Sequence, residues 1–350
     1  MEFCQGAYIQ ADDAIEQLAA RIVGDGFKNV FIYTETPGWN ALEGRLGTKL
    51  DEARVYYHLH FHGDAYPTYS NNSSLANDLN AKHADVIIGV GGGRVMDASK
   101  LLADTLGKNL LLAPTSAAQC ASFTALSAIY MENGARNGGI FIKIPILGTY
   151  VDMRVMRTAP PRLLAAGIAD ALTKLAEPYC AVLFGGEATA RWDTTLALAG
   201  QVIRILFKYS AKALKGNAES LNNVVYAVIC LTGLLSSLGG DRPGLPLAHN
   251  INDAAHDLYT EIPRQYLHGE IVGVGVLLAA YACEIPGLPA NELRGFMKNT
   301  LKMPVTWAEL GYGISENDFE TVLNFITKNN PPLKDKQASI VRDALRSVWA

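Results

Sequence analysis

The sequence predicts two domains, an α/β domain over residues 1–158 and an all-helical domain over residues 159–350. A length of 350 residues exceeds what one hydrophobic core usually supports. In the first 150 residues, β-rich runs alternate with amphipathic stretches, which is typical of a parallel sheet covered by helices. After Pro160 and Pro161, Ala- and Leu-rich stretches with helical spacing replace the strands. We therefore place the boundary within residues 155–162.

The predicted elements of the first domain follow one another in a regular order. Amphipathic stretches predict helices at residues 12–24, 39–52, 69–82 and 94–106. Runs of β-branched and aromatic residues predict strands at residues 30–34, 55–61, 85–90 and 110–113. Extended pieces broken by Gly and Pro fill residues 123–152. The strand at 85–90, DVIIGV, is apolar after its first residue, so we expect it to be buried on both faces.

Composition excludes several classes of protein. Apolar residues make up 49% of the chain and charged residues 18%, which favours packed cores over disorder. A net charge of −4 provides no field suited to binding a nucleic-acid backbone. The longest apolar runs, at residues 224–235 and 271–282, are shorter than the ~20 residues that cross a bilayer. We expect buried helices there, and neither a nucleic-acid nor a membrane partner.

The N-terminal segment and the cysteines favour a cytoplasmic location. Acidic and polar residues occupy the positions where a secretory signal would have a basic end and an apolar run. The five cysteines are odd in number and form no CxxC pair, which is typical of scattered thiols in a reducing compartment.

A glycine-rich turn, formed by Gly91, Gly92 and Gly93, joins the strand at 85–90 to the helix at 94–106. This layout suits a phosphate, because glycines allow close approach and a helix N-terminus offers free N–H groups. The turn is neither GxGxxG nor GxxxxGK[ST], which argues against an ordinary Rossmann fingerprint and a Walker A loop. A tight turn without a ligand is the alternative. Asp97 and Lys100 follow on the first turns of the helix.

Three residues of the second domain form a candidate metal set. Asp170 opens one predicted helix, while His249 and His268 lie on two others. Each alone fits an ordinary role, as a first-turn acid or a packed histidine. Together, one carboxylate and two imidazoles match a catalytic zinc site with three protein ligands and an open position. We keep His256, seven residues after His249, as a reserve ligand.

Three further histidines, His58, His60 and His62, alternate in the run YHLHFH. Alternation on a strand places all three on one face. They suggest either a second metal site or, as the favoured interpretation, a polar strand face near the sheet edge.

Five sequence blocks occur in an order that resembles the metal-dependent alcohol dehydrogenase superfamily: GGGRVMDASK at 91–100, APTSAAQCASFTALSAIY at 113–130, AAGIADALTK at 165–174, AHN at 248–250 and LHGE at 267–270. This group includes glycerol dehydrogenase, iron-containing alcohol dehydrogenases and, more distantly, dehydroquinate synthase. The resemblance runs from about residue 5 to residue 340, and its nearest branch is that of glycerol and hydroxycarboxylate dehydrogenases. It implies a Rossmann-like dinucleotide domain, an all-helical domain, and a cleft between them for cofactor and metal.

The resemblance also implies roles for individual residues. Asp170, His249 and His268 match the metal ligands, through which they would take part in catalysis. The expected dinucleotide contacts are Gly91, Gly92 and Gly93 at the pyrophosphate, Asp97 near the nicotinamide, and Thr115, Ala118, Thr124, Leu126 and Tyr130 along the rest.

Two departures from the family pattern bear on substrate and metal. Cys120 stands where glycerol dehydrogenases usually have an Asp that holds the polyol, and Cys cannot act as a carboxylate acceptor. The hydroxycarboxylate branch has Cys there, and loss of an anion suits a negatively charged substrate. Lys174 stands where iron-type members tend to have a His, which favours Zn²⁺ over Fe²⁺. Lys174 would bind a substrate carboxylate, or alternatively pair with Asp170 or Glu177.

The activity implied is hydride transfer between NAD(P) and a small secondary alcohol, such as glycerol, a 1,2-diol or a 2-hydroxy acid. Glu35, after the strand at 30–34, slightly favours NAD, because an acid there accepts from a ribose 2′-OH and repels a 2′-phosphate. We also expect a homo-oligomer. The alternatives are a dehydroquinate synthase-like lyase that uses NAD and metal, and a catalytically inactive dinucleotide-binding protein.

Overall fold

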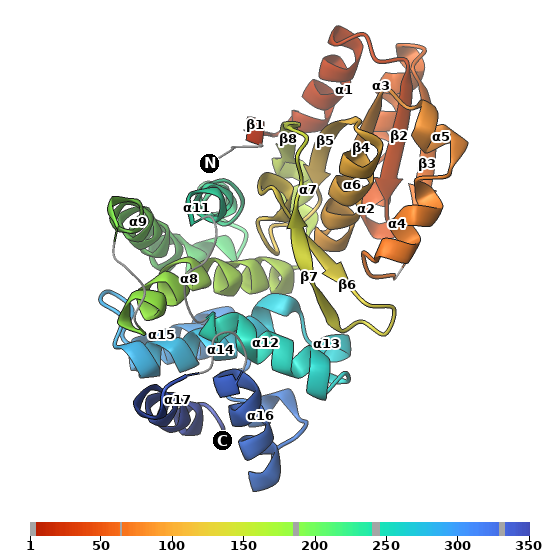
Figure 1. The fold of residues 1–350 in the computed structure, drawn as a ribbon. Helices are drawn as coiled ribbons and strands as arrows, with labels where there is room; N and C mark the ends of the chain where they lie inside the picture. Colours follow the sequence, from red (N-terminus) through yellow and green to blue (C-terminus); the bar gives the residue numbers. More distant parts are fainter. Residues whose placement is uncertain (1–4, 64, 185–188, 240–245, 329–332) are drawn as a thin grey trace. The chain divides into compact units, whose positions relative to one another are not determined.

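The structure is a computed structural model that describes residues 5–63, 65–184, 189–239, 246–328 and 333–350. The chain divides into two compact units, Met1–Pro160 and Pro161–Ala350. The first unit contains a parallel sheet with helices, and every described element of the second unit is helical (Figure 1). The predicted fold class is therefore confirmed.

The first unit is built on a six-stranded parallel sheet with the strand order β1-β8-β5-β4-β2-β3. The bounds of its strands are β1 Gln5–Ala11, β2 Asn29–Thr34, β3 Tyr56–Phe61, β4 Val86–Gly91, β5 Asn109–Pro114 and β8 Ile146–Asp152. An antiparallel hairpin is formed by β6 Leu126–Tyr130 and β7 Arg136–Phe141. All six residues of β4, VIIGVG, are buried, as the apolar sequence predicts for a central parallel strand.

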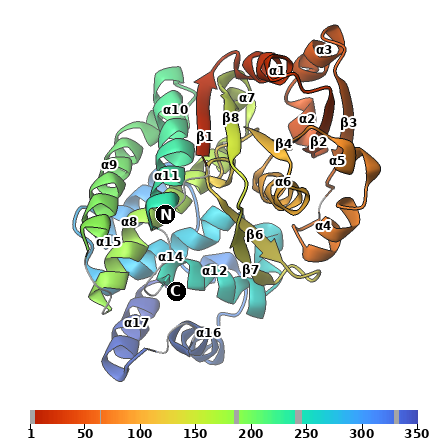
Figure 2. The same ribbon diagram turned by 45° about the horizontal axis from the view of Figure 1, so that its top comes forward.

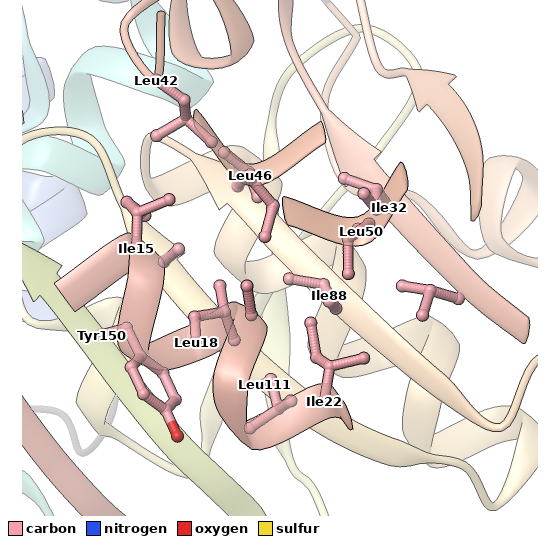
Figure 3. Packing of buried hydrophobic residues seen from close by; sticks show 14 of the residues in the cluster. Ile15, Leu18, Ile22, Ile32, Leu42, Leu46, Leu50, Ile88, Leu111 and Tyr150 are labelled. Carbon is pink, nitrogen blue, oxygen red and sulfur yellow. The ribbon is translucent and has the colours of Figure 1, made fainter. Parts of the chain in front are cut away.

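Helices cover both faces of this sheet (Figure 2). Alternate residues of a strand point to opposite faces, so in β2 Ile32 packs with residues of α1 and α3, whereas Phe31 packs with residues of α5 and α6. Figure 3 shows the first of these two cores. The helices of the unit are α1 Ala14–Gly24, α2 Thr36–Asn40, α3 Arg45–Glu52, α4 Tyr69–Leu75, α5 Leu79–His83, α6 Gly93–Leu106, α7 Met153–Thr158 and the 3-10 helix Ala121–Phe123.

Three elements differ from the sequence prediction. The single helix predicted at 39–52 is two helices, because Gly44 adopts a left-handed φ of 74° between α2 and α3. The helix predicted at 69–82 is also two, because the Asp78 side chain accepts the N–H groups of Asn80 and Ala81 and starts α5. Strand β1 was not predicted, since it is an edge strand whose half-exposed sequence QGAYIQA carries little apolar signal.

Asp152 connects several elements at the end of β8. Its buried carboxylate accepts N–H groups from Ile15 at 3.3 Å, Arg154 at 3.0 Å and Val155 at 3.2 Å, and it pairs with Arg45 at 2.7 Å. Burial would raise the pKa of this carboxyl, but Arg45 and the N–H groups outweigh burial and hold the pKa below its ordinary value. The carboxylate thus stabilises the junction of β8, α1 and α7 in its ionised form.

Asp152→Asn is expected to destabilise the protein by about 2 kcal/mol near neutral pH, because charge-assisted hydrogen bonds are lost in a buried place. A depressed folded pKa contributes stability above the unfolded pKa and loses it as the pH falls through the folded pKa. The difference between wild type and variant in urea unfolding should therefore shrink below about pH 4. A difference that stays constant with pH would contradict the assigned role.

The second unit is formed by helices around α14, which contacts α8, α12 and α17. Nearly every residue of α14 is buried, which accounts for the apolar run at 271–282. The bounds are α8 Pro161–Leu183, α9 Ala190–Ala213, α10 Ala218–Val225, α11 Thr232–Gly239, α12 Leu247–Leu258, α13 Ile262–Gln265, α14 His268–Cys283, α15 Ala290–Phe296, α16 Glu316–Lys328, α17 Asp335–Ser347, the π-helical turns Tyr226–Leu231 and Met297–Leu301, and the 3-10 helix Ala308–Leu310.

One helical stretch in the described part of the chain, Ala218–Leu238, has the length and apolar composition of a membrane span. Its 21 residues exceed the apolar run at 224–235, because polar flanking residues continue the helix. Of its most apolar window, 56% is buried within the protein, as in the core helix of a globular unit.

Cys180 of α8 and Cys283 of α14 form a disulfide, with Cα atoms 5.7 Å apart. The prediction that all five cysteines are scattered thiols is therefore wrong for Cys180 and Cys283. The two residues are 103 positions apart, so sequence spacing gives no indication of the bond. Cys120 and Cys230 are buried and take part in no disulfide, and Cys4 lies outside the described residues.

Candidate functional site

Two glycines allow α14 to approach its neighbours closely. A Cβ at Gly269 would overlap main-chain atoms of Ala166 in α8, and a Cβ at Gly275 would overlap main-chain atoms of Ala248 in α12. Ala166 lies one helical turn before the candidate ligand of α8, and Ala248 directly precedes that of α12. Close helix contacts at these glycines therefore set the spacing of the candidate metal ligands.

Asp170, His249 and His268 come together at this contact. One ligand atom of each residue lies within 4.8 Å of those of the other two. His268 Nε2 is 3.5 Å from Asp170 Oδ1, close to the ~3.3 Å between two ligands of a tetrahedral Zn²⁺. No other such His, Cys, Asp or Glu group occurs among the described residues, so His256 stands outside it. The three side chains fit a divalent cation.

The electrostatics of Asp170 suit a metal ligand. Burial would raise the pKa of this carboxyl, but the hydrogen bond with His268 and the positive charges of Lys174 and the two imidazoles outweigh it. The pKa of Asp170 therefore lies well below its ordinary value. A buried carboxyl that stays ionised is ready to bind a cation.

Each imidazole contacts a second partner through Nδ1. His249 Nδ1 lies 2.6 Å from Glu177 Oε1, and the same oxygen accepts the main-chain N–H of His249 at 3.1 Å. His268 Nδ1 lies 3.0 Å from Asn252 Oδ1. In each ring these contacts use Nδ1, so Nε2 is the nitrogen that would bind a metal.

An ion pair joins the starts of two ligand-bearing helices. Arg162, near the start of α8, donates from Nε and Nη2 to the two oxygens of Glu270, each at 2.7 Å. Glu270 also accepts the N–H of Leu267 at 2.8 Å, which anchors the first turn of α14. Neither this pair nor the partners of the imidazoles were identified from the sequence.

The alternating histidines of β3 pack against the neighbouring strand. The rings of His58 and His60 stack on Phe31 with centroids 5.5 and 6.0 Å apart, and His62 Nδ1 lies 2.6 Å from the Tyr33 hydroxyl. Burial lowers the pKa of His60. Among the described residues, these histidines belong to no group that could hold a metal ion. This agrees with the favoured interpretation, a polar face on the edge strand β3.

The glycine-rich turn follows β4 and starts α6. Gly91 has a φ of +155°, and a Cβ there would contact Val95 at 2.9 Å. The N–H of Gly92 donates to Glu35 Oε1 at 2.7 Å, so this N–H is occupied by a carboxylate. Glu35, the predicted selector of NAD, thus lies directly at the turn.

A glutamine covers the third glycine of the turn. A Cβ at Gly93 would overlap the side-chain amide of Gln119, so the two residues lie in direct contact and a larger residue would displace that side chain. Thr115, a predicted cofactor contact, lies alongside the turn and donates its N–H to Gly91 O at 3.0 Å. Ala118 is half-buried next to the glutamine. Gln119 was missed because no motif distinguishes it from other loop glutamines.

Asp97 and Lys100 form a buried ion pair at 2.9 Å that connects α6 to β6. Burial raises the pKa of the Asp97 carboxyl, and Lys100 opposes this effect. Lys100 Nζ also donates to Thr124 O at 3.3 Å and to Leu126 O, while Ser127 Oγ donates to Asp97 O at 2.8 Å. Three predicted site residues, Asp97, Thr124 and Leu126, thus belong to one network with a clear structural role.

Tyr130 and Cys120 are two further predicted site residues of the first unit. The Tyr130 ring is 4.9 Å from that of Tyr66, on which the guanidinium of Arg94 stacks at 5.1 Å. Burial raises the pKa of Tyr130 to about 12, so its hydroxyl stays protonated. Cys120 is buried, is not disulfide-bonded, and directly precedes the 3-10 helix Ala121–Phe123.

A parallel α/β unit with a glycine-rich turn and a helical unit with an Asp-His-His group are together typical of a metal-dependent dehydrogenase. A family model, iron-containing alcohol dehydrogenase, matches residues 6–146. This match and the long alignment with a glycerol dehydrogenase show that the chain belongs to the iron-containing alcohol dehydrogenase family.

Individual relatives support this assignment. The chain is 30% identical to a glycerol dehydrogenase of Thermotoga maritima, over 91% of this chain and 86% of the relative. It is 32% identical to hydroxycarboxylate dehydrogenase A of Escherichia coli, over 75% of this chain and 74% of the relative. The crystal structure of glycerol dehydrogenase from Schizosaccharomyces pombe has the same fold, with a TM-score of 0.82 and 24% sequence identity. The match covers 99% of this chain and 90% of that structure. Several other curated relatives are matched over only 60% to 64% of their length.

Proposed function

We propose that this protein is an NAD-linked, metal-dependent dehydrogenase that oxidises a small secondary alcohol or reduces the corresponding carbonyl compound. The observation that supports this proposal most directly is the group of Asp170, His249 and His268, whose ligand atoms lie within 4.8 Å of one another. Three protein ligands leave an open position for substrate. Family membership supports the same reaction class.

In the proposed mechanism the residues of the chain hold and orient the reactants. Asp170 provides the anionic ligand, and His249 and His268 direct their Nε2 atoms to the same point. A divalent cation there would supply a Lewis acid that polarises the substrate oxygen. The turn and the N-terminus of α6 would bind the dinucleotide phosphates, and nicotinamide would supply the hydride chemistry. No protein nucleophile is required.

We propose Zn²⁺ as the metal, because the chain offers three ligands and has Lys174 in place of a further imidazole. A carboxylate-bearing alcohol, such as a 2-hydroxy acid, is the proposed substrate class. The buried Cys120 offers no carboxylate to a polyol, and Lys174 carries a positive charge near Asp170. The similarity to hydroxycarboxylate dehydrogenase A supports this choice.

A substrate panel tests the proposal. Metal-stripped protein would receive Zn²⁺, Fe²⁺ or Mn²⁺ and be assayed with NAD and NADP on polyols, 1,2-diols, and 2-hydroxy or 2-oxo acids. We expect net NADH formation, highest with a 2-hydroxy acid and Zn²⁺. Turnover of a phosphorylated substrate without net NADH would instead favour a dehydroquinate synthase-like lyase. A chain that binds neither metal nor dinucleotide would be a catalytically inactive relative.

Glu35→Ser tests the proposed preference for NAD. Removing the carboxylate takes away repulsion of a 2′-phosphate and an acceptor for the 2′-OH, so the kcat/KM ratio of NADP to NAD should rise about 10-fold. Glu52→Ser, which removes an exposed acid on α3, is the control and should leave the ratio unchanged. An unaltered ratio in Glu35→Ser would show that another residue selects the cofactor.

A further inference from the structure

A buried carboxylate lies behind one of the candidate metal ligands. Glu177 is only 6% exposed and stands seven residues after Asp170, on the same face of α8. Its Oε1 accepts from both Nδ1 and the main-chain N–H of His249, at 2.6 and 3.1 Å. A carboxylate only accepts here, so Nδ1 carries a proton and Nε2 is the ring nitrogen that would bind a metal.

The other imidazole has a neutral partner. Asn252, 1% exposed, places Oδ1 3.0 Å from His268 Nδ1, and its Nδ2 donates to Asp253 at 3.3 Å, which assigns the amide orientation. Both rings are therefore held in the same way, with Nδ1 facing an acceptor. They differ in the charge of the group that holds them.

We propose that Glu177 is a positioning residue of the metal centre: it holds His249 with Nε2 toward the metal and provides, besides Asp170, the second negative charge that balances a divalent cation. This inference rests on the proposed function. An imidazole that donates to a carboxylate is a better electron donor to a metal than one that donates to an amide. Asp170 and Glu177 each place one negative charge near the proposed metal position, and Lys174 offsets part of this charge.

Burial of the Glu177 carboxylate increases its electrostatic effect on a nearby metal cation. Two carboxylates within a helical core are costly to bury without positive charge nearby. Low polarity also strengthens the attraction between Glu177 and a cation on the far side of the His249 ring. Replacing the carboxylate with an amide of the same shape should therefore weaken metal binding without removing the hydrogen-bond acceptor.

Two variants separate geometry from charge. Glu177→Gln keeps an acceptor for Nδ1 and removes the charge, whereas Glu177→Ala removes both. Glu219→Gln, at an exposed acid in the first turn of α10, is the matched control for a general change in net charge. Metal-free protein would be titrated with Zn²⁺ in competition with a chromogenic chelator, and with Co²⁺ to record the absorption bands that report coordination geometry. Thermal unfolding of each metal-free protein checks that the fold is retained.

We expect the Kd for Zn²⁺ to rise about 10-fold in Glu177→Gln and up to about 100-fold in Glu177→Ala. The Co²⁺ bands should shift in both variants, and Glu219→Gln should match wild type. If wild type binds one metal and both Glu177 variants bind it equally well with unchanged bands, Glu177 has no role at the metal and the proposed function is unaffected. If wild type binds no metal, the proposed function fails together with this inference.

Discussion

His268→Ala is expected to abolish metal retention and to lower kcat/KM by about 1000-fold, while dinucleotide binding stays close to that of wild type. His268 is one of the three proposed ligands and lies at the N-terminus of α14, and the Lewis-acid contribution that would be lost with the metal is worth several kcal/mol. Metal content by elemental analysis, turnover, and NADH fluorescence titration measure the three quantities on one sample.

His256→Ala is the matched control for this experiment. His256 is a buried histidine of α12 that stands outside the group of three, so the variant should retain its metal and most of its turnover. Normal turnover in His268→Ala, or loss of metal in His256→Ala alone, would contradict the assigned ligand set.

Gly269→Ala is expected to destabilise the second unit by about 1–3 kcal/mol and to weaken metal binding at the same time. The new Cβ would overlap main-chain atoms of Ala166. Main-chain atoms cannot rotate away as a side chain can, so α14 must shift away from α8. That shift separates His268 from Asp170. Urea unfolding of the metal-free protein and Zn²⁺ competition measure the two effects.

Gly273→Ala, four residues further along the same helix, is the control. Its Cβ would meet the flexible side chain of Met303 at 3.3 Å instead of backbone, and alanine favours the helix. We expect little change in stability or metal affinity. If Gly269→Ala behaves like Gly273→Ala, the close contact of α14 with α8 does not set the geometry of the site.

Much of the fold is predictable from local patterns. The period of apolar residues distinguishes the α/β unit from the helical one, and the run VIIGVG identifies the central strand because a parallel strand buried on both faces excludes polar side chains. Strand β1 was missed because its position depends on pairing with β8, about 140 residues later, and not on its own sequence.

The candidate site shows a similar division. Residue types and motif order single out Asp170, His249 and His268, because few combinations of carboxylate and imidazole suit a metal. Their mutual distance depends on glycine contacts of α14, which leave no periodic signal. The partners that hold the site together, such as Glu177 for His249 or Arg162 for Glu270, are separated by 72 and 108 residues. Such contacts follow from the packing of helices, which sequence spacing does not encode.

The central claim is that the Asp-His-His group binds a divalent metal on which alcohol oxidation depends. Its most direct test is a reconstitution titration of chelator-stripped wild-type protein with Zn²⁺, in which bound metal and NADH formation are measured on each sample. We predict that activity rises from background in proportion to occupancy and reaches its plateau at one metal per chain. Full activity in the stripped protein, or a bound metal that restores none, would contradict the claim.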